Sequence, residues 1–123
     1  MKKYVLLILF GVFLITPLAA QKASKIDIVS METIKSEVIG KEVQFLDVRT
    51  PQEFAAGHID GAINMNVMDV TFLEDIKTLD KTQPVYVYCH IGGRSNVAAQ
   101  QLKANGFLLI YDYKGGYNEW SKQ

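Results

Sequence analysis

The sequence predicts an α/β domain built on a mainly parallel sheet. Between Ile26 and Trp120, segments with the apolar pattern of strands alternate with segments whose apolar residues have helical spacing. Such regular alternation is typical of a parallel sheet covered by helices on both faces. The chain has 123 residues, 49% of them hydrophobic and 21% charged, which fits one globular domain. Sites in such sheets lie at the carboxyl ends of the strands, so residues that follow strands deserve most weight.

The first twenty residues differ from the rest and predict a secretory signal peptide. Lys2 and Lys3 form a basic start, an apolar run covers Tyr4 to Ile15, and small residues lead to a cleavage site after Ala20. The apolar run, about a dozen residues, is shorter than the roughly 20 that cross a bilayer as a helix, which favours cleavage over a permanent anchor. We therefore expect a single domain over residues 21–123, exported to the periplasm or secreted, with no stable membrane anchor.

The charge distribution gives no indication of a nucleic-acid partner. The formal net charge is zero, and no run of lysine or arginine exceeds two residues. Loss of Lys2 and Lys3 with the signal peptide leaves 11 basic and 13 acidic residues, a net charge of −2. We expect neither nucleic acid nor an anionic membrane surface as a partner, and we expect a monomer.

The first half of the domain predicts strands that are each followed by a helix or a turn. Residues 26–29 alternate as a strand, and residues 30–40 follow as a helix with Ser30 as N-cap and Gly40 as stop. Residues 43–48 have the pattern of a buried strand. A one-turn helix closed by Gly57 comes next, and residues 59–67 predict a turn and a short strand. The N-cap, the first-turn proline and the capping-box acid of that one-turn helix are Thr50, Pro51 and Glu53.

The second half continues the alternation. Residues 69–79 predict an amphipathic helix, residues 85–88 the central strand, residues 95–105 a second helix and residues 107–111 the last strand. A final short helix with Trp120 follows a turn of two glycines. The apolar positions of the first of these helices are Val70, Phe72, Leu73, Ile76 and Leu79.

The segment from Val85 to Ser95, VYVYCHIGGRS, has the features of a catalytic loop. Cys89, the only cysteine of the chain, directly follows the central strand. Gly92 and Gly93 allow successive N–H groups to face an anion, and the next helix adds its positive end. Helix N-termini and nearby cations such as Arg94 stabilise thiolates. We expect Cys89 to be a catalytic thiolate, although a lone cysteine can also be an inert core residue. The expected binding loop comprises His90, Ile91, Gly92, Gly93, Arg94 and Ser95.

The distribution of arginine and histidine sharpens this prediction. The chain has 11 lysines but only two arginines, and Arg49 and Arg94 each stand just after a predicted strand. Arginine binds oxyanions through a planar fork, so we expect Arg94 to contact the substrate. For Arg49 an ion pair with Asp47 or Glu53 is the better explanation, with Asp47 as a structural acceptor of loop N–H groups. We expect His58 to form structural hydrogen bonds.

Metal chemistry is not expected. The two histidines and one cysteine lack the spacing of metal ligands. A dithiol cycle is also not expected, because no second cysteine is present.

Several ordered motifs resemble the rhodanese family, in particular its small exported single-domain members. The resemblance implies a five-stranded parallel sheet with helices on both faces and a thiosulfate sulfurtransferase activity. Cys89 would take the outer sulfur of a donor such as thiosulfate, form a persulfide and pass the sulfur to cyanide or a thiol. The N–H groups of residues 90–95 would hold the persulfide, Arg94 would draw the sulfite end of the donor, and no metal or organic cofactor would be needed. The motifs are Leu46-Asp47-Val48-Arg49, Glu53-Phe54, Gly57-His58-Ile59, Gly61-Ala62-Ile63-Asn64, Val87-Tyr88-Cys89 with Gly92, Arg94 and Ser95, and Gly115-Gly116 with Trp120.

Two other functions stay open on the sequence. Cysteine phosphatases and arsenate reductases of related fold place the arginine six residues after the cysteine, whereas Arg94 follows Cys89 by five, which suits a smaller sulfur atom. A non-catalytic module that carries sulfur or binds a partner is the other alternative. Thiosulfate-using members often have a permanent positive charge after the cysteine, whereas His90 is usually neutral near pH 7, so donor preference can differ.

Overall fold

The computed structural model describes residues 3, 11 and 23–123. The predicted signal peptide, residues 1–20, lies outside the described residues except for Lys3 and Gly11, so it stays a prediction. Within the described part, no helix has the length and apolar character needed to cross a membrane.

A five-stranded sheet organises the domain, and all of its strand pairs are parallel. The strand order is β1-β5-β4-β2-β3, with β4 in the centre and all four of its residues buried. The predicted parallel α/β architecture is therefore confirmed. The strand expected within residues 59–67 contains only two residues, and the last strand begins two residues later than expected. The strands are β1 (Lys25–Ile28), β2 (Gln44–Asp47), β3 (Ile63–Asn64), β4 (Val85–Tyr88) and β5 (Leu109–Asp112).

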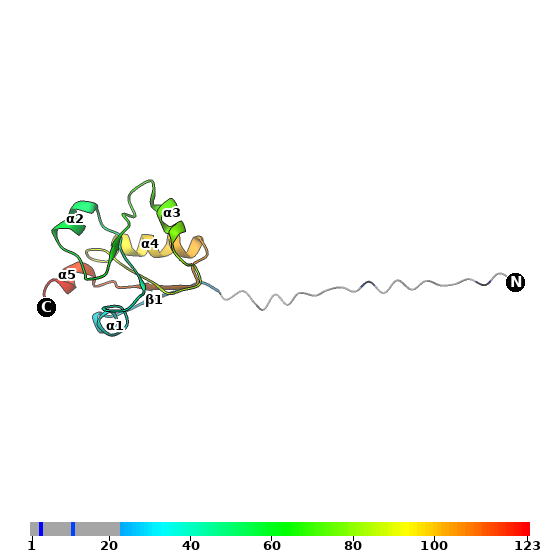
Figure 1. Cartoon of the computed structure of the whole chain (residues 1–123), viewed down its shortest axis with the longest axis horizontal. Coiled ribbons are helices and arrows are strands. Elements are labelled where there is room, and N and C mark those ends of the chain that lie inside the picture. The colour runs from blue at the N-terminus through cyan, green and yellow to red at the C-terminus, as the bar shows by residue number, and fades with distance from the viewer. Residues whose placement is uncertain (1–2, 4–10, 12–22) are drawn as a thin grey trace.

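Helices cover both faces of this sheet, as predicted. Figure 1 shows α1 on one side and α3 and α4 on the other. Tyr117 and Trp120 of α5 pack against the same core as Ile34 of α1. Each side has its own apolar core: Phe72, Ala98 and Leu102 belong to the core under α3 and α4, and Ile34 and Tyr113 belong to the core under α1 and α5. The helices are α1 (Met31–Glu37), α2 (Pro51–Ala56), α3 (Phe72–Asp75), α4 (Gly93–Ala104) and α5 (Gly116–Trp120), and a 3-10 turn covers Ile76–Thr78.

The helix starts follow the local sequence signals. Ser30 caps α1 by accepting a hydrogen bond from the Thr33 N–H at 3.3 Å. Thr50 and Glu53 form the predicted capping box of α2, in which each side chain accepts from the other's backbone N–H at 3.2 and 3.4 Å. These contacts span three residues, so the sequence alone specifies them.

The helix predicted over residues 69–79 is confirmed only in part. Only the single turn of α3 and the following 3-10 turn form there, and Val70 is 96% exposed. The Asp69 carboxylate accepts hydrogen bonds from the N–H and hydroxyl of Thr71, at 2.9 and 3.0 Å, and thereby fixes a turn in place of the first helical residues. The helix expected from residue 95 instead begins at Gly93, two residues nearer to the cysteine.

Candidate active site

Cys89 lies at the carboxyl end of the central strand, at the point where the sequence placed it. Its side chain is 1% exposed and belongs to the core between β4 and α4. The Gly92 N–H donates a hydrogen bond to Cys89 Sγ at 3.0 Å. Gly92 has a φ of 102°, which favours glycine, and its position directly before the 12-residue helix α4 brings the positive end of that helix to the sulfur. A backbone donor and a helix N-terminus thus both face Sγ.

Helix α5 braces the loop of residues 89–95, here called the cysteine loop. The Tyr117 and Asn118 N–H groups donate to the carbonyl oxygens of Cys89 and His90 at 2.9 and 3.0 Å. In a trans peptide the C=O and the following N–H point in opposite directions. The N–H groups of residues 90 and 91 therefore point away from α5, and neither donates to a protein acceptor within residues 23–123. They are available to an anion bound on the loop.

Arg94 and Glu53 form a two-point ion pair beside the cysteine loop. Arg94 Nη1 and Nη2 lie 2.6 and 3.0 Å from Glu53 Oε1 and Oε2, with side chains 28% and 34% exposed. Hydrogen bonds from Arg94 lower the pKa of Glu53 to about 2. The hydrogen bonds to Glu53, and in addition the charge of Cys89, raise the pKa of Arg94. The predicted contact of Arg94 with substrate stays a prediction.

Asp47 and Arg49 form a buried network at the end of β2. Arg49 Nη2 lies 2.6 Å from Asp47 Oδ2, and the Arg49 N–H donates to Asp47 Oδ1 at 3.0 Å, so the predicted ion pair is confirmed with Asp47 and not with Glu53. Tyr88, the last residue of β4, donates its hydroxyl to Asp47 Oδ2 at 2.7 Å and accepts from the Ile59 N–H at 3.0 Å. Burial raises the pKa of Tyr88, so the hydroxyl keeps its proton. The network joins the ends of β2 and β4.

Arg49 also reaches the elements around the cysteine loop. Its Nη2 donates to the Gly57 carbonyl at 2.7 Å, and its guanidinium lies over the Tyr117 ring at 4.4 Å from the centroid. Side-chain space at Gly57 is filled by the Tyr117 hydroxyl. Arg49 therefore holds the end of α2 against α5, the helix that braces the loop. Within residues 23–123 it forms no hydrogen bond with Cys89.

The remaining predicted loop residues divide into buried and exposed groups. Ser95 is fully buried and donates its hydroxyl to the Gly92 carbonyl at 3.3 Å. His90 and Ile91 are exposed, with Ile91 at 70%. Of the six residues, Gly92 contacts the Cys89 sulfur directly, and the side chains of His90 and Ile91 face outward. As predicted, His58 is structural: its Nδ1 lies 2.9 Å from the Phe54 carbonyl oxygen.

Asp112 is a buried group near the site that the sequence analysis missed. It ends β5, pairs in register with Val87 of β4 and is 1% exposed. Both carboxylate oxygens lack a hydrogen-bond partner within the described part of the chain. Burial raises its pKa, which favours the neutral acid. No local pattern marks this residue, because its environment comes from strands that are distant in sequence.

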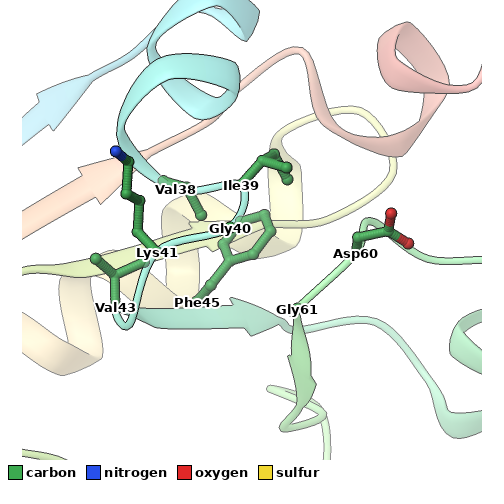
Figure 2. Close-up of a pocket in the computed structure, with 8 residues that line it drawn as sticks. All are labelled: Val38, Ile39, Gly40, Lys41, Val43, Phe45, Asp60 and Gly61. Atoms are coloured by element: carbon green, nitrogen blue, oxygen red, sulfur yellow. The ribbon is translucent and has the colours of Figure 1, made fainter.

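Two surface pockets differ in whether residues of the cysteine loop line them. The pocket in Figure 2, about 400 Å³, lies against the end of α1 and the turn at residues 60–61, and none of its lining residues belongs to the cysteine loop. Its lining is mainly aliphatic and glycine. A second pocket of about 380 Å³ lies against the loop itself and includes Ile91, Gly92 and Gly93. Neither Cys89 nor Arg94 is among the residues that line this second pocket.

The fold and site together define a class: a parallel α/β domain with a cysteine loop between its central strand and the next helix. The family model of the rhodanese-like domain matches residues 30–123. The chain therefore belongs to the rhodanese family.

The chain is similar, at modest identity, to an uncharacterized protein and to proteins named as sulfurtransferases. The uncharacterized protein YqhL of Bacillus subtilis is 34% identical over 98% of this chain and 94% of its own length. The chloroplastic thiosulfate sulfurtransferase 16 of Arabidopsis thaliana is 35% identical over 73% of this chain and 83% of its own length. Among solved structures, human single-domain sulfurtransferase TSTD1 matches with a TM-score of 0.66 and 26% identity over 78% of this chain and 96% of that one.

Proposed function

We propose that this protein is a sulfurtransferase that moves sulfane sulfur from a donor such as thiosulfate to a thiophilic acceptor, cyanide or a thiol, through a persulfide on Cys89. The observation that carries this proposal is the hydrogen bond from the Gly92 N–H to Cys89 Sγ at 3.0 Å, at the N-terminus of α4. A sulfur held in this way is stabilised as an anion, which is the form that attacks and the form that a persulfide takes.

The reaction has two displacements. The Cys89 thiolate attacks the outer sulfur of thiosulfate, a new S–S bond forms on Cys89, and the old S–S bond breaks so that sulfite leaves with the electron pair. In the second step cyanide attacks the outer sulfur of the persulfide, thiocyanate leaves, and the Cys89 thiolate returns. Both steps keep a negative charge on sulfur within the loop, so N–H groups fixed in advance stabilise it throughout.

The other predicted residues have separate roles in this proposal. The N–H groups of residues 90–95 hold the persulfide anion, and Arg94 attracts the donor through the guanidinium N–H groups that Glu53 leaves free. Asp47 and Arg49 are positioning residues that hold the ends of α2, β2 and β4. The chemistry uses no metal or organic cofactor. The partners are a small sulfur donor and a thiol or cyanide, and we place the protein, as a monomer, outside the cytoplasm after loss of residues 1–20.

A coupled assay tests this function. The purified protein is incubated with thiosulfate and cyanide, and thiocyanate is measured, with Cys89→Ser as the control variant. We expect turnover in the wild type and none in the variant. Release of phosphate or reduction of arsenate in the absence of any sulfur donor would instead favour the phosphatase or reductase. Absence of sulfur transfer with every donor would favour the non-catalytic module.

A further inference from the structure

The ion pair between Arg94 and Glu53 limits the positive charge available at the cysteine loop. Both oxygens of Glu53 are engaged by separate nitrogens of Arg94, at 2.6 and 3.0 Å. Glu53 is itself held in place, because its Oε1 also accepts hydrogen bonds from the Thr50 N–H and hydroxyl, at 3.4 and 3.1 Å. The carboxylate is thus fixed by the cap of α2 in front of the arginine that would attract an anionic donor.

The other charges near the loop do not replace Arg94. Arg49 is neutralised by Asp47 at 2.6 Å in a buried pair. Lys114 passes beside Gly92, close enough that a side chain at Gly92 would strike its Cγ, and it forms no salt bridge within residues 23–123. Lys114 and Asp112 line the same pocket beside Gly92 and Gly93, and burial raises the pKa of Asp112, which favours its neutral form. With both arginines paired, Lys114 is the one cation without a salt bridge among the residues that line this pocket. This suits a donor with one negative charge better than a donor with two.

On this basis, and provided that the proposed sulfurtransferase function holds, we propose that Glu53 is a specificity-determining residue that makes the site favour organic persulfides, which are monoanions, over the thiosulfate dianion. The transfer is balanced as before: the Cys89 thiolate attacks the outer sulfur of the persulfide, the donor's S–S bond breaks, and a thiolate leaves with the electron pair. An organic persulfide has no sulfite group, so no part of this donor has to compete with Glu53 for Arg94.

The ionisation of Glu53 does not change under ordinary assay conditions. Because hydrogen bonds from Arg94 lower its pKa to about 2, the carboxylate stays charged at any pH at which the domain is assayed. The donor preference must therefore be altered by substitution and not by pH.

The informative variant is Glu53→Gln. The amide oxygen can still accept from the Thr50 N–H and cap α2, but the negative charge is lost and Arg94 is released. The rate of sulfur loading on Cys89 is measured by quenching the reaction at timed intervals and determining the intact protein mass by mass spectrometry. The two donors are thiosulfate and a low-molecular-weight alkyl persulfide. We expect the thiosulfate-to-persulfide rate ratio to rise about 3- to 10-fold, and to rise less at high salt.

Two further variants make the result decisive. Glu74→Gln removes the same charge from an exposed ion pair with Lys77 at 2.8 Å, and its rate ratio should equal that of the wild type. Arg94→Gln leaves Glu53 unpaired, so its rate ratio should move in the opposite direction, which keeps the test informative even if Glu53→Gln folds poorly. This inference is overturned if the thiosulfate-to-persulfide rate ratio of Glu53→Gln is unchanged or lower, or if that of Arg94→Gln is unchanged. In either case, loading of sulfur on the wild type would still support the proposed function. If no donor loads the wild type, the proposed function fails first and the inference with it.

Discussion

Substitution of Gly116 by alanine tests how the cysteine loop is held. Gly116 begins α5 with a φ of +65°, a conformation that L side chains rarely adopt. A Cβ at this position would lie 2.5 Å from the His90 carbonyl oxygen and 2.6 Å from that of Cys89. Both obstacles are backbone atoms of the loop, so they cannot rotate away as a side chain could. The variant must move either the loop or the start of α5.

The expected loss of stability follows from these contacts. The left-handed backbone costs about 1 to 2 kcal/mol for a residue with a Cβ. Displacement of α5 also weakens its two hydrogen bonds to the loop carbonyls, at about 1 kcal/mol each. We therefore expect Gly116→Ala to lower the free energy of unfolding by about 3 to 4 kcal/mol. A folded domain with ordinary stability survives such a loss, so activity can still be measured.

Gly40→Ala is the matched control. Gly40 has a φ of +73°, but a Cβ there meets no heavy atom within 4 Å. Urea denaturation should show a loss of only about 1 to 2 kcal/mol for the control, and its sulfur loading should match the wild type. Loading of Gly116→Ala should fall about tenfold or more, because small displacements of catalytic groups are costly. If both variants lose equal stability and load sulfur equally well, α5 does not brace the loop as described.

Three further predictions concern single buried or paired groups. Tyr88→Phe deprives Asp47 and the Ile59 N–H of a buried partner, so urea denaturation should show a loss of about 2 to 3 kcal/mol, and a loss below about 1 would contradict the network. Burial raises the pKa of Asp112 in the folded state, so this group makes stability fall as pH rises above about 4. Asp112→Asn should flatten that decrease and raise the free energy of unfolding at pH 7. A variant that is less stable than the wild type at pH 7 would show that the carboxylate has a partner. Arg94→Ala breaks a partly exposed ion pair, so it should destabilise the folded domain by about 1 kcal/mol, yet slow sulfur loading from thiosulfate about tenfold. If the variant were unfolded, the role of this arginine would be structural.

Local sequence signals predicted the parts of the fold that depend on neighbouring residues. The capping box of Thr50 and Glu53 spans three positions, and the strand that ends before Cys89 is a continuous apolar run, so both were predictable. The start of the helix predicted over residues 69–79 was not predictable, because its apolar spacing competes with the turn that Asp69 forms with Thr71. Periodicity alone does not tell which of these local structures is the more stable.

The parts of the site that could not be predicted depend on distant residues. Glu53 was recognised as a helix cap, but its pairing with Arg94 joins positions 41 apart in sequence. Tyr88 lies in the apolar run of the central strand, and its hydroxyl joins Asp47, also 41 positions away, to the Ile59 N–H, 29 positions away. The sequence indicated which residue types were present at each strand end. Only the sheet order determines which of these ends are neighbours.

The central claim is that Cys89 carries the transferred sulfur, and peptide mass spectrometry tests it most directly. The protein is incubated with thiosulfate or an alkyl persulfide, its remaining thiols are blocked, and the peptide that contains Cys89 is analysed. We predict that this peptide gains the mass of one sulfur atom, that cyanide removes it as thiocyanate, and that Cys89→Ser gains nothing. A wild-type protein that gains no sulfur from any donor would contradict the account.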